Sequence, residues 1–171
     1  MAERFVALLR AVNVGGTGKL EMAELRRMCE AAGFTDVRTY IASGNVVFGA
    51  AMSEAEVKAT LEAALADYAG KPVGVMVRTA AEMAAVRDGN PFADFEGNTV
   101  TAIFLDTPPA PGLLDAVTGQ ADEELAFGAR ELYVHYPSGM GRSKLAIKGA
   151  EAGTARNMNT VAKLAAMAAE A

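Results

Sequence analysis

One stretch near the N-terminus constrains the fold more than any other: an apolar run followed at once by a basic, glycine-rich segment. Residues 5–9 are Phe-Val-Ala-Leu-Leu, an unbroken apolar segment typical of a buried strand. Residues 10–19 then read Arg-Ala-Val-Asn-Val-Gly-Gly-Thr-Gly-Lys. Cationic groups at the end of a core strand, beside a permissive backbone, predict either a ligand-binding loop or a plain flexible connection.

The basic segment is not a phosphate-binding loop of the nucleotide-hydrolysing type. The pattern G-x-x-x-x-G-K-[ST] requires a glycine where Asn13 stands and a hydroxyl-bearing residue where Leu20 stands. Both departures remove a group on which that chemistry depends. Arg10, Asn13 and Lys19 stay candidates for binding a ligand in another way.

The first half of the chain predicts the order β-α-β-β-α-β, the split motif of ferredoxin-like domains. The caps are well marked, because Gly33 suits a left-handed helix end and Ser53 with Glu56 forms a capping-box pattern. The expected elements are a strand at 5–9, a helix at 22–32, strands at 36–41 and 45–48, a helix at 53–68 and a strand at 72–78.

The second half nearly repeats this order, so we expect an α+β protein with two similar halves. After a connecting helix at 79–87, the expected elements are a strand at 99–105, a short helix at 111–117, strands at 124–130 and 131–136, and a last helix from about 155. No low-complexity linker intervenes, which favours a single compact domain over 1–171 with possible halves 1–89 and 90–171.

Composition excludes several classes of protein. The net charge is −5, which argues against general nucleic-acid binding. The basic excess falls at the two ends, because residues 1–49 carry +1, residues 50–136 carry −9 and residues 137–171 carry +3. No apolar run reaches membrane-spanning length, and no signal peptide is evident. With a single cysteine, these features predict a cytoplasmic protein.

Dedicated catalytic or metal-binding groups are scarce. The chain has one histidine, His135, and one cysteine, Cys29, too few for a structural zinc site, so we expect no metal and assign no cofactor. No Gly-x-Ser-x-Gly motif accompanies His135. We therefore interpret His135 as a structural residue of a strand and Cys29 as a small buried apolar side chain.

Two polar turns are candidate sites. Ser43-Gly44-Asn45 joins two expected strands; its residues suit either an ordinary turn or donors exposed at a sheet end. In Gly139-Met-Gly-Arg142-Ser143-Lys144, two glycines accompany two cations. That combination suits either a mobile basic loop or a loop that grips an anion with backbone amides.

The start of the last expected helix carries a third candidate. Thr154 is a good N-cap, which would place Arg156, Asn159 and Thr160 on one helical face. An arginine is unfavourable at the positive end of a helix unless an anion binds beside it. That anion is either a ligand or a carboxylate of the protein itself.

Several separated motifs resemble the family of the domain of unknown function 1697. They are Ala-Leu-Leu-Arg-Ala-Val-Asn-Val-Gly-Gly at 7–16, the helix start at 22–26, Thr-Tyr-Ile-Ala-Ser-Gly-Asn-Val-Val-Phe at 39–48, Gly-Arg-Ser-Lys-Leu at 141–145 and Thr-Ala-Arg-Asn-Met-Asn-Thr-Val at 154–161. The resemblance implies an α+β fold of ferredoxin-like halves and no particular activity. Ala42 and Met158 replace the family's Gln and Trp, and the segment before Thr154 is shortened.

Two hypotheses from different classes follow. In the first, the protein binds a small phosphorylated or carboxylated metabolite, or a nucleotide, through a basic patch on which Arg10, Asn45, Arg142 and Arg156 converge. Its candidate residues are Arg10, Asn13, Lys19, Ser43, Asn45, Arg142, Lys144, Arg156 and Asn159. In the second, the protein is a non-catalytic structural or interaction module whose Arg and Asn side chains form an internal network. Neither a reaction nor an oligomeric state is predicted.

Overall fold

The described residues of the chain group into two compact units. The computed structural model describes residues 3–12 and 19–170. The first unit comprises residues 1–84 with 164–171, and the second comprises residues 85–163. The boundaries fall within two helices, α3 (Ala80–Asp88) and α4 (Met158–Ala169). The predictions of one compact domain and of halves 1–89 and 90–171 stay predictions.

The first unit is built on a four-stranded antiparallel sheet. Its strands lie in the order β2-β3-β1-β4, and every neighbouring pair is antiparallel. The elements along the chain are β1 (Glu3–Leu9), α1 (Met22–Ala31), β2 (Thr35–Thr39), β3 (Asn45–Ala50), α2 (Glu54–Ala69) and β4 (Val75–Thr79). This order matches the one predicted for the first half.

The predicted helix caps of the first unit are confirmed. At the start of α2, Ser53 Oγ accepts a hydrogen bond from the Glu56 amide, and the Glu56 side chain accepts one from the Ser53 amide. The helix ends at Gly70, whose φ is 72°. After α1, Gly33 has a φ of 91°, and the Phe34 amide donates to the carbonyl of Cys29. This six-to-one bond is the Schellman arrangement that glycine permits.

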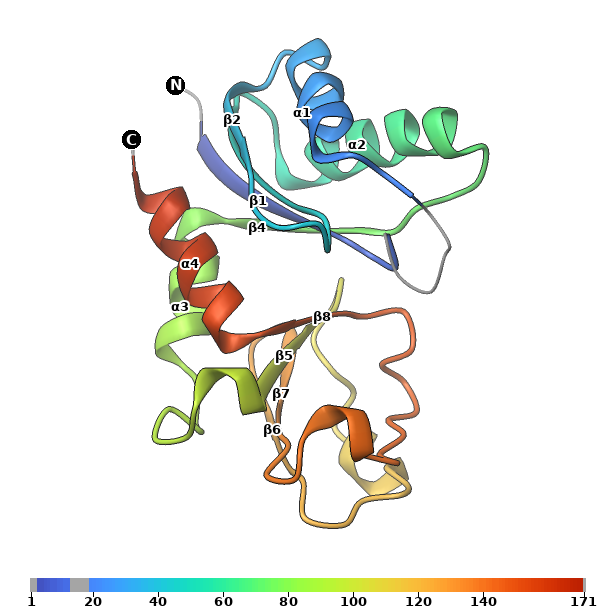
Figure 1. The fold of residues 1–171 in the computed structure, drawn as a ribbon, viewed down its shortest axis with the longest axis vertical. Helices are drawn as coiled ribbons and strands as arrows, with labels where there is room; N and C mark the ends of the chain where they lie inside the picture. The colour runs from blue at the N-terminus through green and yellow to red at the C-terminus, as the bar shows by residue number, and fades with distance from the viewer. Residues whose placement is uncertain (1–2, 13–18, 171) are drawn as a thin grey trace. The chain divides into compact units, whose positions relative to one another are not determined.

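Both faces of the central strands in the first unit are buried. Helices α1 and α2 lie on one face of the sheet (Figure 1), where Leu25, Cys29 and Leu61 pack against alternate residues of β1 and β3. The other residues of β1, Val6 and Leu8, are also fully buried. Burial on both sides explains why residues 5–9 form a continuous apolar run instead of an alternating pattern.

The opposite face of the first sheet carries arginines that sequence periodicity did not single out. Arg78 on β4 is opposite Val6 in the strand pairing and is 1% exposed, and one of its Nη atoms donates to the carbonyl of Val77. Arg38 on β2 donates to the carbonyl of Met167 and forms an ion pair with Glu170. The last residues of the chain are thereby held by β2.

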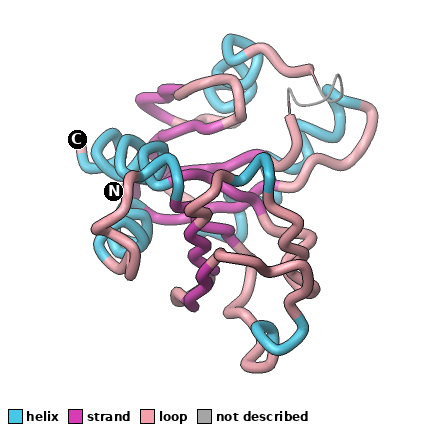
Figure 2. The backbone as a smooth tube through the Cα atoms, turned by 60° about the horizontal axis from the view of Figure 1, so that its bottom comes forward, coloured by secondary structure: helices cyan, strands magenta, loops and turns pink. Residues whose placement is uncertain are grey.

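The second unit repeats the strand order without α-helices in the connections between its strands. Its sheet, in the order β6-β7-β5-β8, contains β5 (Val100–Phe104), β6 (Glu124–Phe127), β7 (Glu131–His135) and β8 (Thr154–Asn157), all antiparallel. Its strands are linked by loops with short helical turns (Figure 2), and η1 (Gly97–Thr99), η2 (Leu113–Ala116) and η3 (Met140–Arg142) are 3₁₀ turns. The short helix predicted at 111–117 is present as the 3₁₀ helix η2 over a shorter range.

The prediction that the last helix begins near residue 155 with Thr154 as its N-cap is wrong. Residues 154–157 form strand β8, which pairs with β5 so that Arg156 is opposite Ala102. Helix α4 begins at Met158, and the Asn157 side chain accepts a hydrogen bond from the Thr160 amide at 2.9 Å. Thr and Asn are both good caps, and pairing with β5 selects the later one.

The class predicted from the sequence is confirmed at the level of an α+β protein with two four-stranded antiparallel sheets. A smaller apolar cluster supports the second sheet, with Leu113, Leu132, Val134 and Tyr136 at its centre. Within residues 3–12 and 19–170, no helix is long and apolar enough to cross a membrane.

Candidate functional site

A pocket of about 250 Å³ lies in the first unit where β1 ends, and we call it the β1-end pocket. Its walls come from the end of β1, the segment before α1, the last turn of α2 and the loop that leads to β4. The described residues that line it are Arg10, Ala11, Val12, Lys19, Leu20, Leu65, Tyr68, Ala69, Lys71, Pro72, Val73 and Gly74.

Strand pairing brings these segments together. Because β4 runs antiparallel to β1, its start lies beside the end of β1, and the Arg10 amide donates to the carbonyl of Gly74 at 2.9 Å. The loop between α2 and β4 therefore passes next to residues 10–12. Gly70 ends α2 in the left-handed conformation, and Lys71 follows at once.

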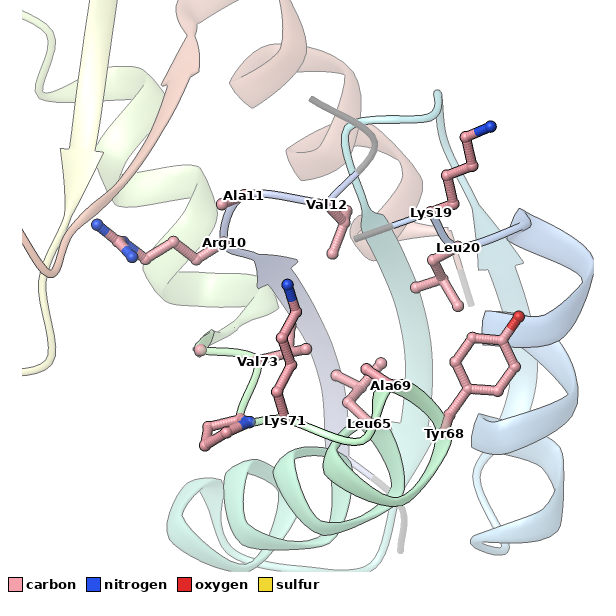
Figure 3. Close-up of a pocket in the computed structure, with 12 residues that line it drawn as sticks. Arg10, Ala11, Val12, Lys19, Leu20, Leu65, Tyr68, Ala69, Lys71 and Val73 are labelled. Atoms are coloured by element: carbon pink, nitrogen blue, oxygen red, sulfur yellow. The ribbon is translucent and has the colours of Figure 1, made fainter. Parts of the chain in front are cut away.

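The β1-end pocket has an apolar floor and a cationic edge. Leu65, Val73 and Leu20 gather at the floor, and Lys71 extends over it toward the backbone at Ala11 (Figure 3). Arg10 and Lys19 point outward on opposite sides in the same view. Tyr68 is 49% exposed and lies at the end of α2. No Asp or Glu belongs to the described lining, although Asp67 and Glu21 are sequence neighbours of lining residues.

The Ser43-Gly44-Asn45 turn supports one wall of the β1-end pocket. Gly44 has a φ of 93°, and a methyl group on it would lie 2.6 Å from Val12 Cγ2 and 2.9 Å from Leu9 Cβ. Its carbonyl accepts a hydrogen bond from the Leu9 amide. Only glycine combines this backbone with so close an approach, so the turn fixes the position of Val12.

Asn45 and Ser43 are engaged within their own turn. Asn45 is fully buried, and its amide nitrogen donates to the carbonyl of Tyr40 and to Ser43 Oγ, both at 2.9 Å. Ile41 in the same turn has a φ of 50°, which is unfavourable for a β-branched residue. The hydrogen bonds of Asn45 offset part of the free-energy cost of this backbone conformation at Ile41.

The cations of residues 142–144 occupy a different setting in the second unit. Arg142 and Lys144 line a pocket of about 500 Å³ together with Asp122, Glu123 and Ser138. Ser143 donates a hydrogen bond to the Glu123 carboxylate, and Ser138 donates to Asp122 at 2.5 Å. The bond from Ser143, followed by that from the Ala121 amide, lowers the pKa of Glu123 below its usual range. Carboxylates of the protein therefore share this pocket with the cations.

Arg156 and Asn159 do not share a helical face, because Arg156 precedes α4. Arg156 is half-buried on β8, donates to the carbonyl of Ala155 at 2.8 Å, and has its pKa lowered to about 10 by burial. Asn159 packs over the backbone of Gly97 in η1. Both belong to the second unit, so the predicted convergence of Arg10, Asn45, Arg142 and Arg156 stays a prediction.

His135 is packed among aromatic rings, as expected of a structural residue. It is 5% exposed, and its ring stacks on Phe95 with centroids 3.9 Å apart and on Phe92 at 5.8 Å. Cys29 is fully buried, and burial raises the pKa of its thiol to about 12. Within the described parts of the chain, no three His, Cys, Asp or Glu side chains are grouped as metal ligands would be.

Of the residues predicted to bind a ligand, Arg10 and Lys19 line the β1-end pocket, whereas Asn13 lies outside the described residues. Sequence reasoning missed Lys71 and Tyr68. Once a ferredoxin-like order is predicted, the antiparallel pairing of the first and fourth strands brings the loop at 70–74 beside Arg10. That topological step could have found Lys71, because neither periodicity nor a motif marks it.

Comparisons with known proteins agree on the fold and are silent on activity. The chain is similar in structure to the conserved bacterial protein SP0830 from Streptococcus pneumoniae, with a TM-score of 0.79, 24% sequence identity, and coverage of 98% of this chain and 99% of that one. Among curated proteins, no sequence matches. The family model described as "Protein of unknown function (DUF1697)" matches residues 2–133, which excludes the motifs at 141–145 and 154–161. The chain belongs to this family.

Proposed function

We propose that the protein binds a small anionic metabolite, phosphorylated or carboxylated, in the β1-end pocket; nucleotides fall within the same chemical class. One observation carries the proposal: Arg10, Lys19 and Lys71 line a pocket with an apolar floor, with no carboxylate among the described lining residues. Like charges gathered at one small concavity create a positive potential that an anion relieves. No reaction is part of the proposal.

Each cation has a role that suits its chemistry. Lys71 extends over the floor and would contact the anionic head group directly. The guanidinium of Arg10, which points outward in Figure 3, would have to turn toward the ligand to hold a carboxylate or phosphate through two parallel hydrogen bonds, and Lys19 would add a point charge. A hydrogen bond between such charged groups contributes about 1.5–3 kcal/mol.

A structural role for Lys71 competes with this assignment. Helix α2 ends at the pocket, and the partial negative charge of a helix C-terminus is stabilised by a nearby cation by about 0.3–1 kcal/mol. If that were its whole purpose, removing Lys71 would lower stability slightly and change no binding. The two roles therefore differ in a measurable way.

The second hypothesis, an internal network, is supported in the second unit. Ser143 and Ser138 donate to Glu123 and Asp122, and these carboxylates line the same pocket as Arg142 and Lys144. Asn45 is likewise engaged with Tyr40 and Ser43. We therefore propose that these residues support the structure and that ligand binding rests on the β1-end pocket.

Two broader assignments belong to the same proposal. The strand order shared by the two sheets supports a ferredoxin-like arrangement in each unit. A cytoplasmic location is supported by the single, buried cysteine, which suits a reducing compartment.

Thermal shift measurements with a panel of phosphorylated and carboxylated metabolites test the proposal. A ligand that binds the native state must raise the melting temperature, by an amount equivalent to about 2.7 kcal/mol at 100 times its Kd. We expect such a ligand to lose its effect in Lys71→Ala. Lys163→Ala, which removes an exposed lysine that lines none of these pockets, is the matched control. Equal losses in both variants, or no stabilising anion, would contradict the proposal.

A further inference from the structure

We infer that the ligand of the β1-end pocket is an amphiphilic anion, an aryl or short branched-alkyl phosphate or carboxylate, and not a sugar phosphate. This inference rests on the proposed function and specifies the part of the ligand that the cations do not contact. It follows from the side chains of the pocket floor.

The side chains of the floor offer no hydrogen-bond partner to a hydroxyl group. The described lining side chains other than Arg10, Lys19, Lys71 and the phenol of Tyr68 are aliphatic, and they come from Ala11, Val12, Leu20, Leu65, Ala69, Pro72 and Val73. Val12, Leu20 and Leu65 are buried in the same apolar cluster that supports the first sheet. The floor is thus an opening onto the apolar core.

A sugar placed on this floor would give up water without regaining hydrogen bonds. Hydroxyl groups removed from water need a partner to offset their desolvation, and aliphatic side chains supply none. An aryl or branched alkyl group has no hydrogen bonds with water to give up, and its burial is favourable in proportion to the apolar area covered. The floor therefore discriminates in favour of an apolar ligand body.

The dimensions limit that body to about one ring. Sites for drug-sized ligands generally enclose roughly 300–1,000 Å³, whereas the β1-end pocket encloses about 250 Å³. The half-exposed ring of Tyr68 at its edge adds a flat surface against which an aromatic body can pack. Lys71 extends over the floor, so the anionic group lies at the edge while the body lies inside.

Binding of phenyl phosphate, ribose 5-phosphate and inorganic phosphate, measured by isothermal titration calorimetry, tests this inference. The first two share a phosphate monoester and differ in the body. We expect phenyl phosphate to bind at least about tenfold more tightly than ribose 5-phosphate, since loss of apolar contacts in a pocket changes binding by roughly 10–200-fold. Binding of all three should weaken in Lys71→Ala and persist in Lys163→Ala.

A second variant tests the contribution of the apolar floor to binding separately from that of the cations. Val73→Thr keeps the shape of a half-buried floor residue and adds a hydroxyl, so it should reduce the preference for phenyl phosphate while inorganic phosphate binds as before. Far-UV circular dichroism would verify that this variant is folded. If ribose 5-phosphate binds as tightly as phenyl phosphate with the same dependence on Lys71, the inference is overturned and the proposed function stands. If the binding of no probe depends on Lys71, both the inference and the proposed function are overturned.

Discussion

The two units have the same strand order and achieve it by different means. In the first, β2-β3-β1-β4 is supported by α1 and α2, which pack a large apolar cluster onto one face. In the second, β6-β7-β5-β8 has 3₁₀ turns and loops in the corresponding connections and a smaller cluster. The same strand order therefore forms without α-helices in the connections between strands. In the second unit, contacts between loops accompany the buried apolar residues of the sheet.

Those loop contacts are specific. Thr118 and Ala146 exchange two backbone hydrogen bonds, and next to them the backbone of Gly119 approaches the carbonyl of Lys144 so closely that a side chain would collide with it. Ser143 is held by Glu123 nearby. The acidic segment before β6 and the basic segment before β8 are therefore fastened to each other, so Arg142 and Lys144 belong to a segment that contacts within the protein hold in place.

The largest expected effect comes from a pair of glycines with the same backbone conformation. Gly70 has a φ of 72° with open space around it, whereas Gly119 has a φ of 71° and faces the Lys144 carbonyl. Gly70→Ala should cost only the left-handed conformation, about 1–2 kcal/mol. Gly119→Ala should add overpacking and cost about 2–5 kcal/mol in total. Urea unfolding, monitored by circular dichroism, measures the unfolding free energy of both variants. Equal losses would show that the loops at Gly119 and Lys144 can move apart without a further cost in stability.

A second pair compares polar turns. Asn45→Ala leaves the Tyr40 carbonyl without its buried donor and should cost about 1–3 kcal/mol of unfolding free energy. Ser143→Ala removes a hydroxyl from a half-buried loop, so we expect a loss below about 1 kcal/mol. Thermal unfolding of the two variants, side by side, tests the ranking. A reversed ranking would make the second unit the one that depends more on its polar network.

A third test concerns the start of α4. Asn157→Ala should cost about 1 kcal/mol, similar to Ser53→Ala at the start of α2, because each removes an N-cap. Thr154→Val should be neutral or slightly stabilising, since the buried Thr154 hydroxyl has no hydrogen-bond partner among the described residues. Melting temperatures of these variants distinguish the observed start of α4 at Met158 from the start near residue 155 that the sequence predicted. In that case Thr154→Val would be the destabilising change.

The smallest expected effect is a dependence on pH confined to the second unit. Because the folded protein lowers the pKa of Glu123, the stabilisation is present above the unfolded pKa of about 4.3 and is lost as pH falls below it through the lower folded value. Glu123→Gln should therefore flatten the acid side of a plot of melting temperature against pH. Glu3→Gln, at an exposed position on β1, should leave the plot unchanged. A parallel change in both variants would mean that overall charge, not the Ser143 bond, governs acid sensitivity.

Sequence reasoning succeeded where one local signal decided the structure. The capping box at Ser53, the glycine at 33 and the apolar run at 5–9 each fixed an element of the first unit without help from distant residues. It failed at β8, where Thr154 and Asn157, three positions apart, were equally good cap residues and pairing with β5 chose between them. It also missed Lys71 and Arg78, because their surroundings arise only when strands far apart in the sequence are paired.

The place of residues 164–171 has a consequence for synthesis of the chain on the ribosome. These last residues belong to the first unit, and Arg38 holds Met167 and Glu170 there. Domains usually fold in order from the N-terminus as translation proceeds at about 5–20 residues per second. The first unit cannot be completed in that order, since the 79 intervening residues from Ala85 to Lys163 take roughly 4–16 s to translate at those rates. The face of the first sheet that carries Arg38 is therefore completed only after Met167 and Glu170 have been synthesised.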